Sequence, residues 1–358
     1  MMESSEKGLL EIDGSFGEGG GQILRTGLAV SAVAKRALKI HHIRAARRNP
    51  GLQPQHLKAA ESLAQITRAR VEGLRIGSDT VTFAPQEIIP GEYRFEIGTA
   101  GSVTLLLQAL LPPLVFSSGR SRVTLVGGTH VPWSPPFHYL KEVFLPTLRL
   151  MGIGIEVELS RWGWYPKGGG VVDVKIEPNS DVKPLSLTHR GRLKKIRGLS
   201  AISNLPGHVA HRQRDYALRR IARDTSATVE IEILQDAPAI GQGSFLFLVA
   251  ESENGVAGFS SLGRRGKPAE EVAKEAVECL EEYLGSDGCV DPFLADQLVP
   301  FMGLAQADFS FTTTRITEHL LTNLWVVQQF FNLNVLTSGK KGGPGRIELR
   351  FLKKPRNL

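Results

Sequence analysis

The chain has 358 residues, of which 42% are hydrophobic and 22% charged, the balance of an ordinary globular protein. This length exceeds what one hydrophobic core usually supports, so two or more domains are expected. The longest apolar stretch, residues 103–116, is too short to span a bilayer and is interrupted by Pro112 and Pro113. The first residues lack the apolar core of a secretory signal, and two cysteines exclude a disulfide framework. These features predict a cytoplasmic protein without a membrane segment.

The formal net charge is +7, and the lysines and arginines are clustered. Basic clusters favour a polyanionic partner because they contact phosphate groups. Arg44, Arg47 and Arg48 flank a turn at residues 49–51 and are expected to project into a site. The arginines within residues 212–223 also fit the solvated face of a helix, so they do not by themselves indicate a binding surface.

A glycine-rich block at residues 14–22, with one carboxylate at Glu18, separates a short apolar run from a helical pattern. Such a turn lets backbone N–H groups approach a phosphate at the start of a helix. The block is not a P-loop, because no Gly-Lys-Ser/Thr closes it. It also misses the dinucleotide fingerprint, because Gln22 replaces the third glycine. The alternative is a tight turn with a purely structural role.

The chain shows one pattern of elements three times: a helix, a strand, a second helix and two strands. The expected elements are 21–35, 38–44, 53–67, 70–74 and 80–84 in the first copy; 102–116, 121–126, 136–151, 153–159 and 171–177 in the second; and 293–305, 308–313, 318–331, 334–337 and 346–351 in the third. The pattern predicts pseudo-symmetric units rather than a solenoid, because the period is longer than that of solenoid repeats.

Residues 184–286 interrupt this pattern and are long enough for a small α/β domain. The expected elements there are a strand at 195–202, a helix at 209–223, strands at 228–234 and 244–250, and a helix at 268–284. We therefore expect a core domain in two pieces around an inserted domain. The predicted domains are 1–183 (core, copies one and two), 184–286 (insert) and 287–358 (core, copy three).

The glycine runs differ in their positions within the copies, and this difference predicts different roles for them. Residues 168–170 and 342–343 fall between the last two strands of their copies, where glycine serves a hairpin turn. Residues 14–22 instead precede the first helix, and their counterparts in the other copies are residues 98–102 and 293–297. If the copies pack around a common centre, these helix starts converge on one cleft.

His319 is the histidine best placed for chemistry. Thr317 is expected to cap the helix that follows, and His319 lies in its first turn, off the buried stripe. The positive end of the helix disfavours imidazolium, so a neutral ring with a free lone pair is expected. A neutral imidazole beside a bound triphosphate is a competent nucleophile toward phosphorus. A lone histidine at a helix start can equally be structural.

The other histidines give weaker signals. His41 and His42 stand in an alternating strand, so at most one is expected to face inward. His56 lies near the basic turn at 49–51 and could contact an anion. His208 and His211 are three residues apart but have no third ligand nearby, and no histidine, cysteine and carboxylate spacing resembles a zinc site.

A series of sequence blocks stands in a fixed order from about residue 9 to residue 351. They are Asp13-Gly14 with residues 17–25; Ile43-Arg44-Ala45 with Pro50-Gly51-Leu52; Tyr93-Arg94-Phe95 with residues 98–102; Gln108; Gly127-Gly128-Thr129; Tyr165-Pro166 with residues 168–170; Leu294-Ala295-Asp296-Gln297-Leu298; and His319-Leu320-Leu321-Thr322-Asn323. Together, with an insert in the expected place, these blocks resemble the RNA 3′-terminal phosphate cyclase family.

The resemblance implies an α+β fold. Its core has three repeats, each with two helices on a four-stranded sheet like the C-terminal domain of translation initiation factor three, plus a small α/β insert. It implies a ligase-class nucleotidyltransferase that uses ATP and a divalent metal, Mg or Mn, to convert an RNA 3′-phosphate into a 2′,3′-cyclic phosphodiester. The reaction passes through a covalent histidyl-AMP and an RNA-adenylate. The implied partners are RNA 3′-phosphate ends and ATP, with no membrane and no obligate protein partner.

The family's functional residues carry over by position. His319 is implied as the nucleophile, through Nε2, and Glu18 as the residue that holds the metal. The adenosine part of ATP is assigned to Gln108, Phe293, Leu294, Ala295, Asp296 and Gln297. The triphosphate or the RNA end is assigned to Arg25, Arg44, Arg47 and Gln55.

Two departures and two rival readings accompany the resemblance. Phe293 stands where many relatives have tyrosine, and residues 130–133 replace a polar loop, which leaves the role of that loop open. One rival is the non-enzymatic branch of the family, which lacks the catalytic histidine. The other is an enolpyruvyl-transferase-like enzyme, which needs no histidine nucleophile and does not explain the insert.

Overall fold

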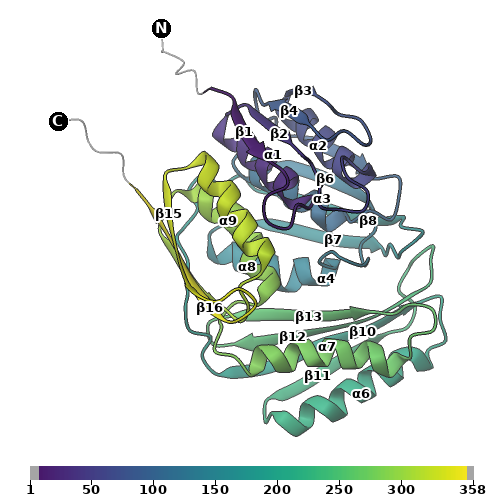
Figure 1. The fold of residues 1–358 in the computed structure, drawn as a ribbon. Coiled ribbons are helices and arrows are strands. Elements are labelled where there is room, and N and C mark those ends of the chain that lie inside the picture. Colours follow the sequence, from purple (N-terminus) through teal and green to yellow (C-terminus); the bar gives the residue numbers. More distant parts are fainter. Residues whose placement is uncertain (1–7, 353–358) are drawn as a thin grey trace.

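The computed structural model describes residues 8–352 and shows a mixed α+β protein built on four-stranded sheets (Figure 1). The first sheet has the strand order β1-β2-β4-β3, with β1 and β2 parallel and the other pairs antiparallel. Its elements are β1 (Leu10–Asp13), α1 (Gln22–Ala34), β2 (Leu38–His41), α2 (Pro54–Thr67), β3 (Arg70–Glu72) and β4 (Val81–Ala84). Helix α1 ends at Lys35, whose left-handed backbone turns the chain into β2.

The second sheet has the order β5-β6-β8-β7. Its elements are β5 (Glu92–Glu96), α3 (Val103–Val115), β6 (Ser121–Gly127), α4 (Phe137–Tyr139), η1 (Leu140–Phe144), α5 (Leu145–Leu150), β7 (Ile155–Arg161) and β8 (Gly170–Ile176). The predicted continuous helix at 136–151 is therefore wrong in detail, because a π-helical segment, η1, separates two short α-helices. The predicted hairpin around residues 168–170 is confirmed, since β7 and β8 pair antiparallel on either side of it.

The third sheet has the order β15-β16-β14-β9. Its elements are β9 (Ser186–Leu187), α8 (Pro292–Ala305), β14 (Phe309–Thr313), α9 (Glu318–Phe330), β15 (Leu333–Gly339) and β16 (Gly345–Phe351). When each of these three sheets is written starting from its first strand in the chain, the third sheet becomes β9-β14-β16-β15. The three sheets then share one strand order and one pattern of parallel and antiparallel pairs. The predicted hairpin around residues 342–343 is also confirmed, because β15 and β16 pair antiparallel.

A fourth sheet, β11-β10-β12-β13, lies between β9 and α8 in the chain. Its elements are β10 (Leu193–Ser203), α6 (His208–Asp224), β11 (Thr228–Leu234), β12 (Gly243–Ser252), β13 (Val256–Leu262) and α7 (Ala269–Leu284). Helices α6 and α7 cover one face of this sheet and enclose a separate hydrophobic core (Figure 1). Residues 186–187 fall inside the predicted insert at 184–286, but they form β9, a strand that was not predicted and that pairs with β14 of the third sheet. The separate sheet therefore starts at β10.

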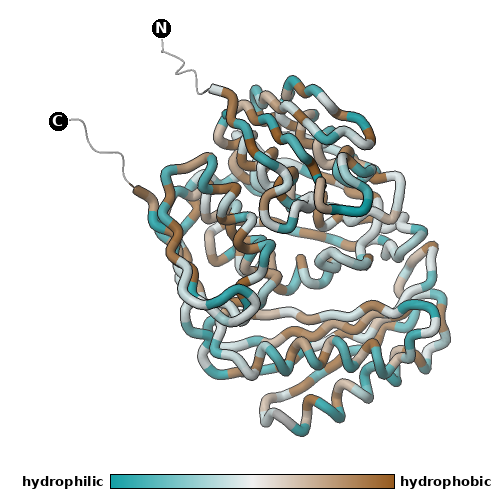
Figure 2. Tube along the Cα trace, in the orientation of Figure 1, coloured by the Kyte–Doolittle hydropathy of each residue, from teal (hydrophilic) through white to brown (hydrophobic). Residues whose placement is uncertain are grey.

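The helices of the three other sheets face one another in the interior. Helix α1 packs against α3, α8 and α9, and α8 packs against α9, although α1 and α9 lie at opposite ends of the sequence (Figure 1). Their facing side chains, such as Leu28, Leu107 and Val326, are completely buried. Hydrophobic and hydrophilic segments alternate along the helices, as one buried face requires (Figure 2). This packing brings the starts of distant helices together.

The loop at residues 130–133 has a structural role where the inserted sheet meets the second sheet. The His130 ring is buried, stacks on Trp162 with centroids 4.0 Å apart, and meets Phe245 of β12 edge-on. Its Nε2 atom lies 2.8 Å from Nδ1 of His138. Burial lowers the pKa of His138 to about 3 and holds the pKa of His130 well below its ordinary value. Both rings are therefore neutral in the folded protein at neutral pH.

Acid should therefore weaken the fold through this histidine pair. The folded state disfavours the charged rings. The contribution of the neutral rings to the free energy of unfolding is therefore fully present above pH 6.5, and it is lost as the pH falls from 6.5 toward about 3. Each ring changes the free energy of unfolding by up to about 1.4 kcal/mol per pH unit in that window. Urea unfolding at a series of pH values should show a shallower acid loss in His138→Gln than in the wild type. His211→Gln, at a half-buried histidine on α6, is the control, and parallel curves for all three proteins would contradict this account.

Candidate functional site

The glycine-rich block and the start of α9 form a charged site centred on Glu18 and His319. Glu18 Oε2 lies 2.9 Å from Nε2 of His319, and its other oxygen pairs with Arg47. The Glu18 side chain is 17% exposed, whereas that of His319 is 52% exposed and therefore reachable by a ligand. The prediction that Thr317 caps α9 is confirmed, because its hydroxyl accepts from the Leu320 N–H. His319 thus sits in the first turn of α9, as predicted.

The glycines of the block allow this approach. Gly17 and Gly19 have φ values of +60° and +55°, which favour residues without a Cβ. A Cβ on Gly17 would also collide with the Thr322 hydroxyl of α9, and one on Gly19 would lie 2.9 Å from the Cβ of Ala46. Phe16 adds a stacked contact with Trp325 of α9, with ring centroids 3.9 Å apart. The block is therefore a tight structural turn that also delivers Glu18 to the histidine.

Gln22 orients the imidazole from its other side. Its Oε1 lies 2.5 Å from Nδ1 of His319, and its Nε2 donates to Asp296 Oδ2 at 2.9 Å. Because the amide oxygen only accepts, Nδ1 carries a hydrogen and Nε2 is left to face Glu18. Asp296, Gln22, His319 and Glu18 thus form one hydrogen-bonded chain that joins α8, α1, α9 and the glycine block.

The electrostatics of His319 run against the sequence prediction. The helix start was expected to keep the ring neutral, but the hydrogen bond to the Glu18 carboxylate raises the pKa of the imidazole above the ordinary value of 6.5, with Asp296 acting in the same direction. Burial opposes ionisation of Glu18, yet His319 and Arg47 outweigh it and lower the pKa of the carboxyl. The carboxylate at 2.9 Å therefore favours the protonated ring more than the partial charge of the helix end disfavours it.

Two further charged groups lie behind this pair. Burial raises the pKa of Asp296 to about 7, although His319, Gln22 and Arg25 oppose the shift. Burial lowers the pKa of Arg25 to about 10, and Asp296 and Glu18 act on it through charge rather than through a hydrogen bond. Arg25 therefore remains a half-buried cation whose donors are not committed to either carboxylate, an arrangement suited to an anionic ligand.

The predicted adenosine-contacting residues occupy the start of α8 and the facing side of α3. Phe293 is 53% exposed and presents its ring at the start of α8, whereas Leu294 and Ala295 are buried. Gln108 donates to the side chain of Gln297 at 2.6 Å. The structure therefore joins Gln108 to residues 293–297, and it offers Phe293 rather than Leu294 or Ala295 as an exposed surface.

The predicted phosphate-contacting residues stand around the start of α1. Arg44 donates to the carbonyls of Asn49 and Gly51 and so closes the basic turn, while Gln55 accepts from the Ser102 N–H at 3.1 Å. His56 lies against Gly21, where any Cβ would collide with its ring, and burial lowers its pKa to about 3. The buried His56 Nδ1 has no hydrogen-bond partner among the described residues.

Sequence reasoning missed three residues that hold the site together: Gln22, Thr26 and Asn323. Thr26 donates to the Asn323 side chain at 2.7 Å, and Asn323 donates to the Asp296 carbonyl at 2.8 Å. Gln22 belongs to the sequence blocks that carry the family resemblance, but no role was assigned to it there. Its available signal was its place as the last residue of the glycine block and the first residue of α1.

Other surfaces carry less chemistry. Three arginines of α6 pair with acidic residues within the insert: Arg212 with Glu270, Arg214 with Asp215, and Arg220 with Glu281. A hollow of about 720 Å³ lies on the second sheet, where residues of β5, β6, β7 and β8, such as Glu92 and Lys175, line it. His319 is not among its lining residues. Across residues 8–352, no helix is both long and apolar enough to cross a membrane.

A histidine at a helix start, held between an amide and a carboxylate beside the half-buried Arg25, is an arrangement suited to an anionic ligand. A family model described as RNA 3′-terminal phosphate cyclase matches residues 16–336. Curated proteins with that name are 45% identical over 340 residues in Thermococcus kodakarensis, covering 95% of this chain and 98% of the relative, and 43% identical over 347 residues in Methanopyrus kandleri, covering 96% and 99%. A third, from Caldivirga maquilingensis, is 45% identical over 335 residues, covering 92% and 94%. The chain belongs to the RNA 3′-terminal phosphate cyclase family.

The Glu18 carboxylate should control the protonation of His319. Replacing Glu18 with Gln removes the negative charge of the acceptor whose hydrogen bond most raises the His319 pKa, so that pKa should fall. An NMR titration that follows the imidazole of His319 in the wild type and in Glu18→Gln would measure the change. Lys39→Gln, at a distant exposed ion pair with Glu11, is the control and should leave the curve in place. An unchanged His319 pKa in Glu18→Gln would contradict the electrostatic account of the pair.

Proposed function

We propose that the chain converts an RNA 3′-terminal phosphate into a 2′,3′-cyclic phosphodiester at the expense of ATP, with His319 as the nucleophile. The observation that carries the proposal is the orientation of His319, whose Nδ1 is held by Gln22 while Nε2 lies 2.9 Å from Glu18 on a side chain that is 52% exposed. The names of the relatives and the family match support the overall reaction.

The proposed reaction has three steps. The Nε2 lone pair attacks the α-phosphorus of ATP, a P–N bond forms, and pyrophosphate leaves with the electrons of the broken P–O bond. An oxygen of the RNA 3′-phosphate then takes the AMP from the histidine and restores the free imidazole. Finally, the neighbouring 2′-hydroxyl attacks the 3′-phosphorus, gives up its proton, and AMP leaves.

His319 must lose its proton and its contact with Glu18 before Nε2 can attack. Glu18 fits a single carboxylate ligand for Mg²⁺ or Mn²⁺, with phosphate oxygens and water as the remaining ligands. The cation would offset negative charge around the reacting phosphorus. A Glu18 carboxylate that held the cation would no longer accept the hydrogen bond that most raises the pKa of His319, and the lone pair on Nε2 would be more readily available. Gln22 keeps the ring in place during this change.

The phosphate groups of ATP and RNA are proposed to bind around the start of α1. Gly21 caps this helix without a side-chain hydrogen bond, so its first N–H groups are open to an anion. Arg25 and Arg47 supply guanidinium groups, Gln55 retains a free amide, and Arg44 shapes the adjoining turn. The orphaned nitrogen of His56 marks a buried polar position that a ligand or water can satisfy.

The adenosine part of ATP is proposed to lie over Phe293, with Gln108, Asp296 and Gln297 near it. The buried side chains of Leu294 and Ala295 shape this end of the site through the backbone of α8. We also propose that the three sheets with the shared strand order are copies of one repeat, with the fourth sheet as an inserted domain. The presence of His319 in the chain argues against the non-enzymatic branch.

The first test looks for the covalent intermediate. Protein incubated with Mg²⁺ and ATP labelled at the α-phosphate should gain a label that acid removes and alkali does not, as expected of a P–N bond. His319→Ala should abolish the label, and Glu18→Ala should reduce it strongly because the metal and the orientation of the histidine are both lost. Labelling is read from gels after acid or alkali treatment, with RNA cyclisation assayed in parallel.

The matched control is His211→Ala, which changes a surface histidine of α6 that contacts Gln235. It should label as the wild type does. Circular dichroism should show all variants folded. A folded wild type without label, or a folded His319→Ala that keeps the label, would refute the proposed chemistry.

The second test addresses the stacking surface. Phe293→Ala removes an aromatic face, and base stacking contributes about 1–3 kcal/mol. The KM for ATP should therefore rise by roughly 5- to 150-fold, while Phe293→Tyr should remain close to the wild type. Steady-state kinetics with varied ATP measure the effect. Phe16→Ala, at an exposed ring stacked on Trp325, tests whether loss of any surface aromatic near the site has the same result. Equal KM values for Phe293→Ala and the wild type would exclude stacking on this ring.

A further inference from the structure

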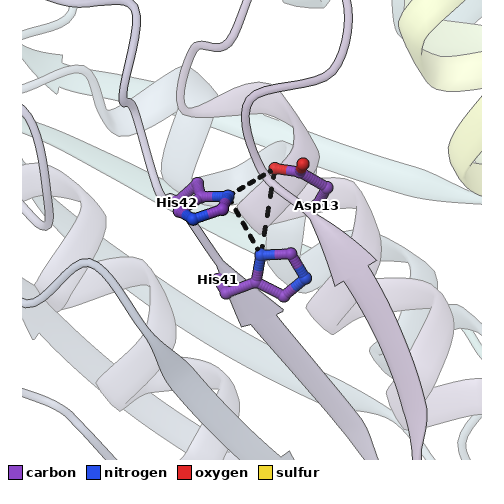
Figure 3. A group of neighbouring side chains, drawn as sticks. All are labelled: Asp13, His41 and His42. Atoms are coloured by element: carbon purple, nitrogen blue, oxygen red, sulfur yellow. Dashed lines mark hydrogen bonds and ion pairs between the residues drawn. The ribbon is translucent and has the colours of Figure 1, made fainter.

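A second group of ligand-type side chains lies at the ends of β1 and β2. Figure 3 shows Asp13, His41 and His42 with the two Nδ1 atoms turned toward one carboxylate oxygen. The two Nδ1 atoms are 3.1 Å apart, and they lie 3.9 Å (His41) and 3.2 Å (His42) from Asp13 Oδ1. Within the described residues, this is the one set of three histidine, cysteine or acidic side chains close enough to share a metal ion.

The backbone creates this cluster against the expectation from the sequence. Adjacent residues of a strand point to opposite sides, so at most one of the two histidines was predicted to face inward. Strand β2 instead ends at His41, and His42 has a φ of +53°, a left-handed conformation that is unfavourable for most residues. This turn swings the second imidazole to the same side as the first. An unfavourable backbone conformation that gathers three ligand atoms calls for a functional explanation.

The spacing fits a tetrahedral transition metal. Ligands about 2.1 Å from a tetrahedral Zn²⁺ ion lie about 3.4 Å from one another, a value within the range of 3.1–3.9 Å observed here. Two imidazoles and one carboxylate suit Zn²⁺ or a similar ion better than Mg²⁺, which prefers oxygen ligands. The side chains are 33% (His41), 59% (His42) and 45% (Asp13) exposed, so a fourth position is open to water.

Asp13 is held in place by a second layer of contacts. Its Oδ1 accepts from the backbone N–H of Ser15 at 2.9 Å and from the Ser15 hydroxyl at 2.8 Å. These bonds lower the pKa of Asp13 and keep it in the ionised form that binds cations. Gly14, which stands between Asp13 and Ser15 in the chain, packs against the backbone carbonyls of His41 and His42. A Cβ at this position would lie 2.9 Å from the His41 oxygen and 3.2 Å from the His42 oxygen. The carboxylate and the histidines are therefore fixed relative to one another.

We propose that Asp13, His41 and His42 bind one Zn²⁺-type transition-metal ion, at a site separate from Glu18. Asp13 directly precedes the glycine-rich block, and His41 and His42 lead into the turn that carries Arg47. The bound ion would join these two loops where they begin. The ion pair between Glu18 and Arg47 joins the same two loops at later residues. The site therefore serves to order the loops that supply the charged groups around His319, and it does not depend on the proposed reaction.

Metal titration of the full chain without ATP tests the site. After treatment with a chelator, the protein is titrated with Zn²⁺ by calorimetry, and with Co²⁺ while its visible absorption is followed. The wild type should bind one equivalent and give the spectrum of tetrahedral Co²⁺. His41→Asn/His42→Asn should weaken binding more than tenfold, and Ser15→Ala, which removes only a second-layer contact, should weaken it by about tenfold.

Two controls separate this site from the other histidines. His208→Asn/His211→Asn removes the histidine pair of α6, and His319→Ala removes the partner of Glu18; both should bind Zn²⁺ as the wild type does. Equal melting temperatures in chelator would show that all variants fold. Zn²⁺ should also slow hydrogen exchange in residues 14–21 and 42–51 of the wild type. Tight binding that survives in His41→Asn/His42→Asn, or no binding by the wild type, would overturn the metal site, and unchanged exchange would overturn its role in ordering the loops.

Discussion

The hydrogen-bonded chain from Asp296 through Gln22 and His319 to Glu18 is the constraint on which the site depends. Each member comes from a different element, so the chain closes only when α1, α8, α9 and the glycine-rich block are all in place. Both nitrogens of His319 are thereby assigned, one to an amide and one to a carboxylate. If His319 acts as the proposed nucleophile, a ring held in this way would need no reorientation, which would remove an entropic cost from the chemical step.

The packing of the helices explains how such distant residues meet. Helices α1, α3, α8 and α9 bury apolar faces against one another, and glycine at position 17 lets the block come down onto α9. Polar contacts then follow at the helix starts, where backbone groups are open and side chains such as Gln55 and Gln108 cross between the parts of the fold. The sheets lie outside this helical centre and position the loops that feed it.

The charges of the site are balanced against one another in the absence of ligand. Glu18 raises the pKa of His319 and pairs with Arg47, while burial raises the pKa of Asp296 to about 7. An anionic ligand and its cation would therefore compete for groups that are already paired. In the proposed reaction, release of Glu18 from His319 would free Nε2.

The sequence by itself determined the α+β class, most helices and strands, the hairpins at the glycine runs, and the place of His319 behind its Thr317 cap. Periodicity and capping are local, so they can be read from neighbouring residues. It did not reveal the strands β5, β9 and β13 or the break at η1, because these elements depend on their partners in the fold. Tertiary structure alone decided that Gln22 holds His319, that Glu18 raises the pKa of the histidine, and that His42 turns back to join His41 and Asp13. These outcomes depend on distances between residues far apart in the chain and on one left-handed backbone angle, which no local pattern encodes.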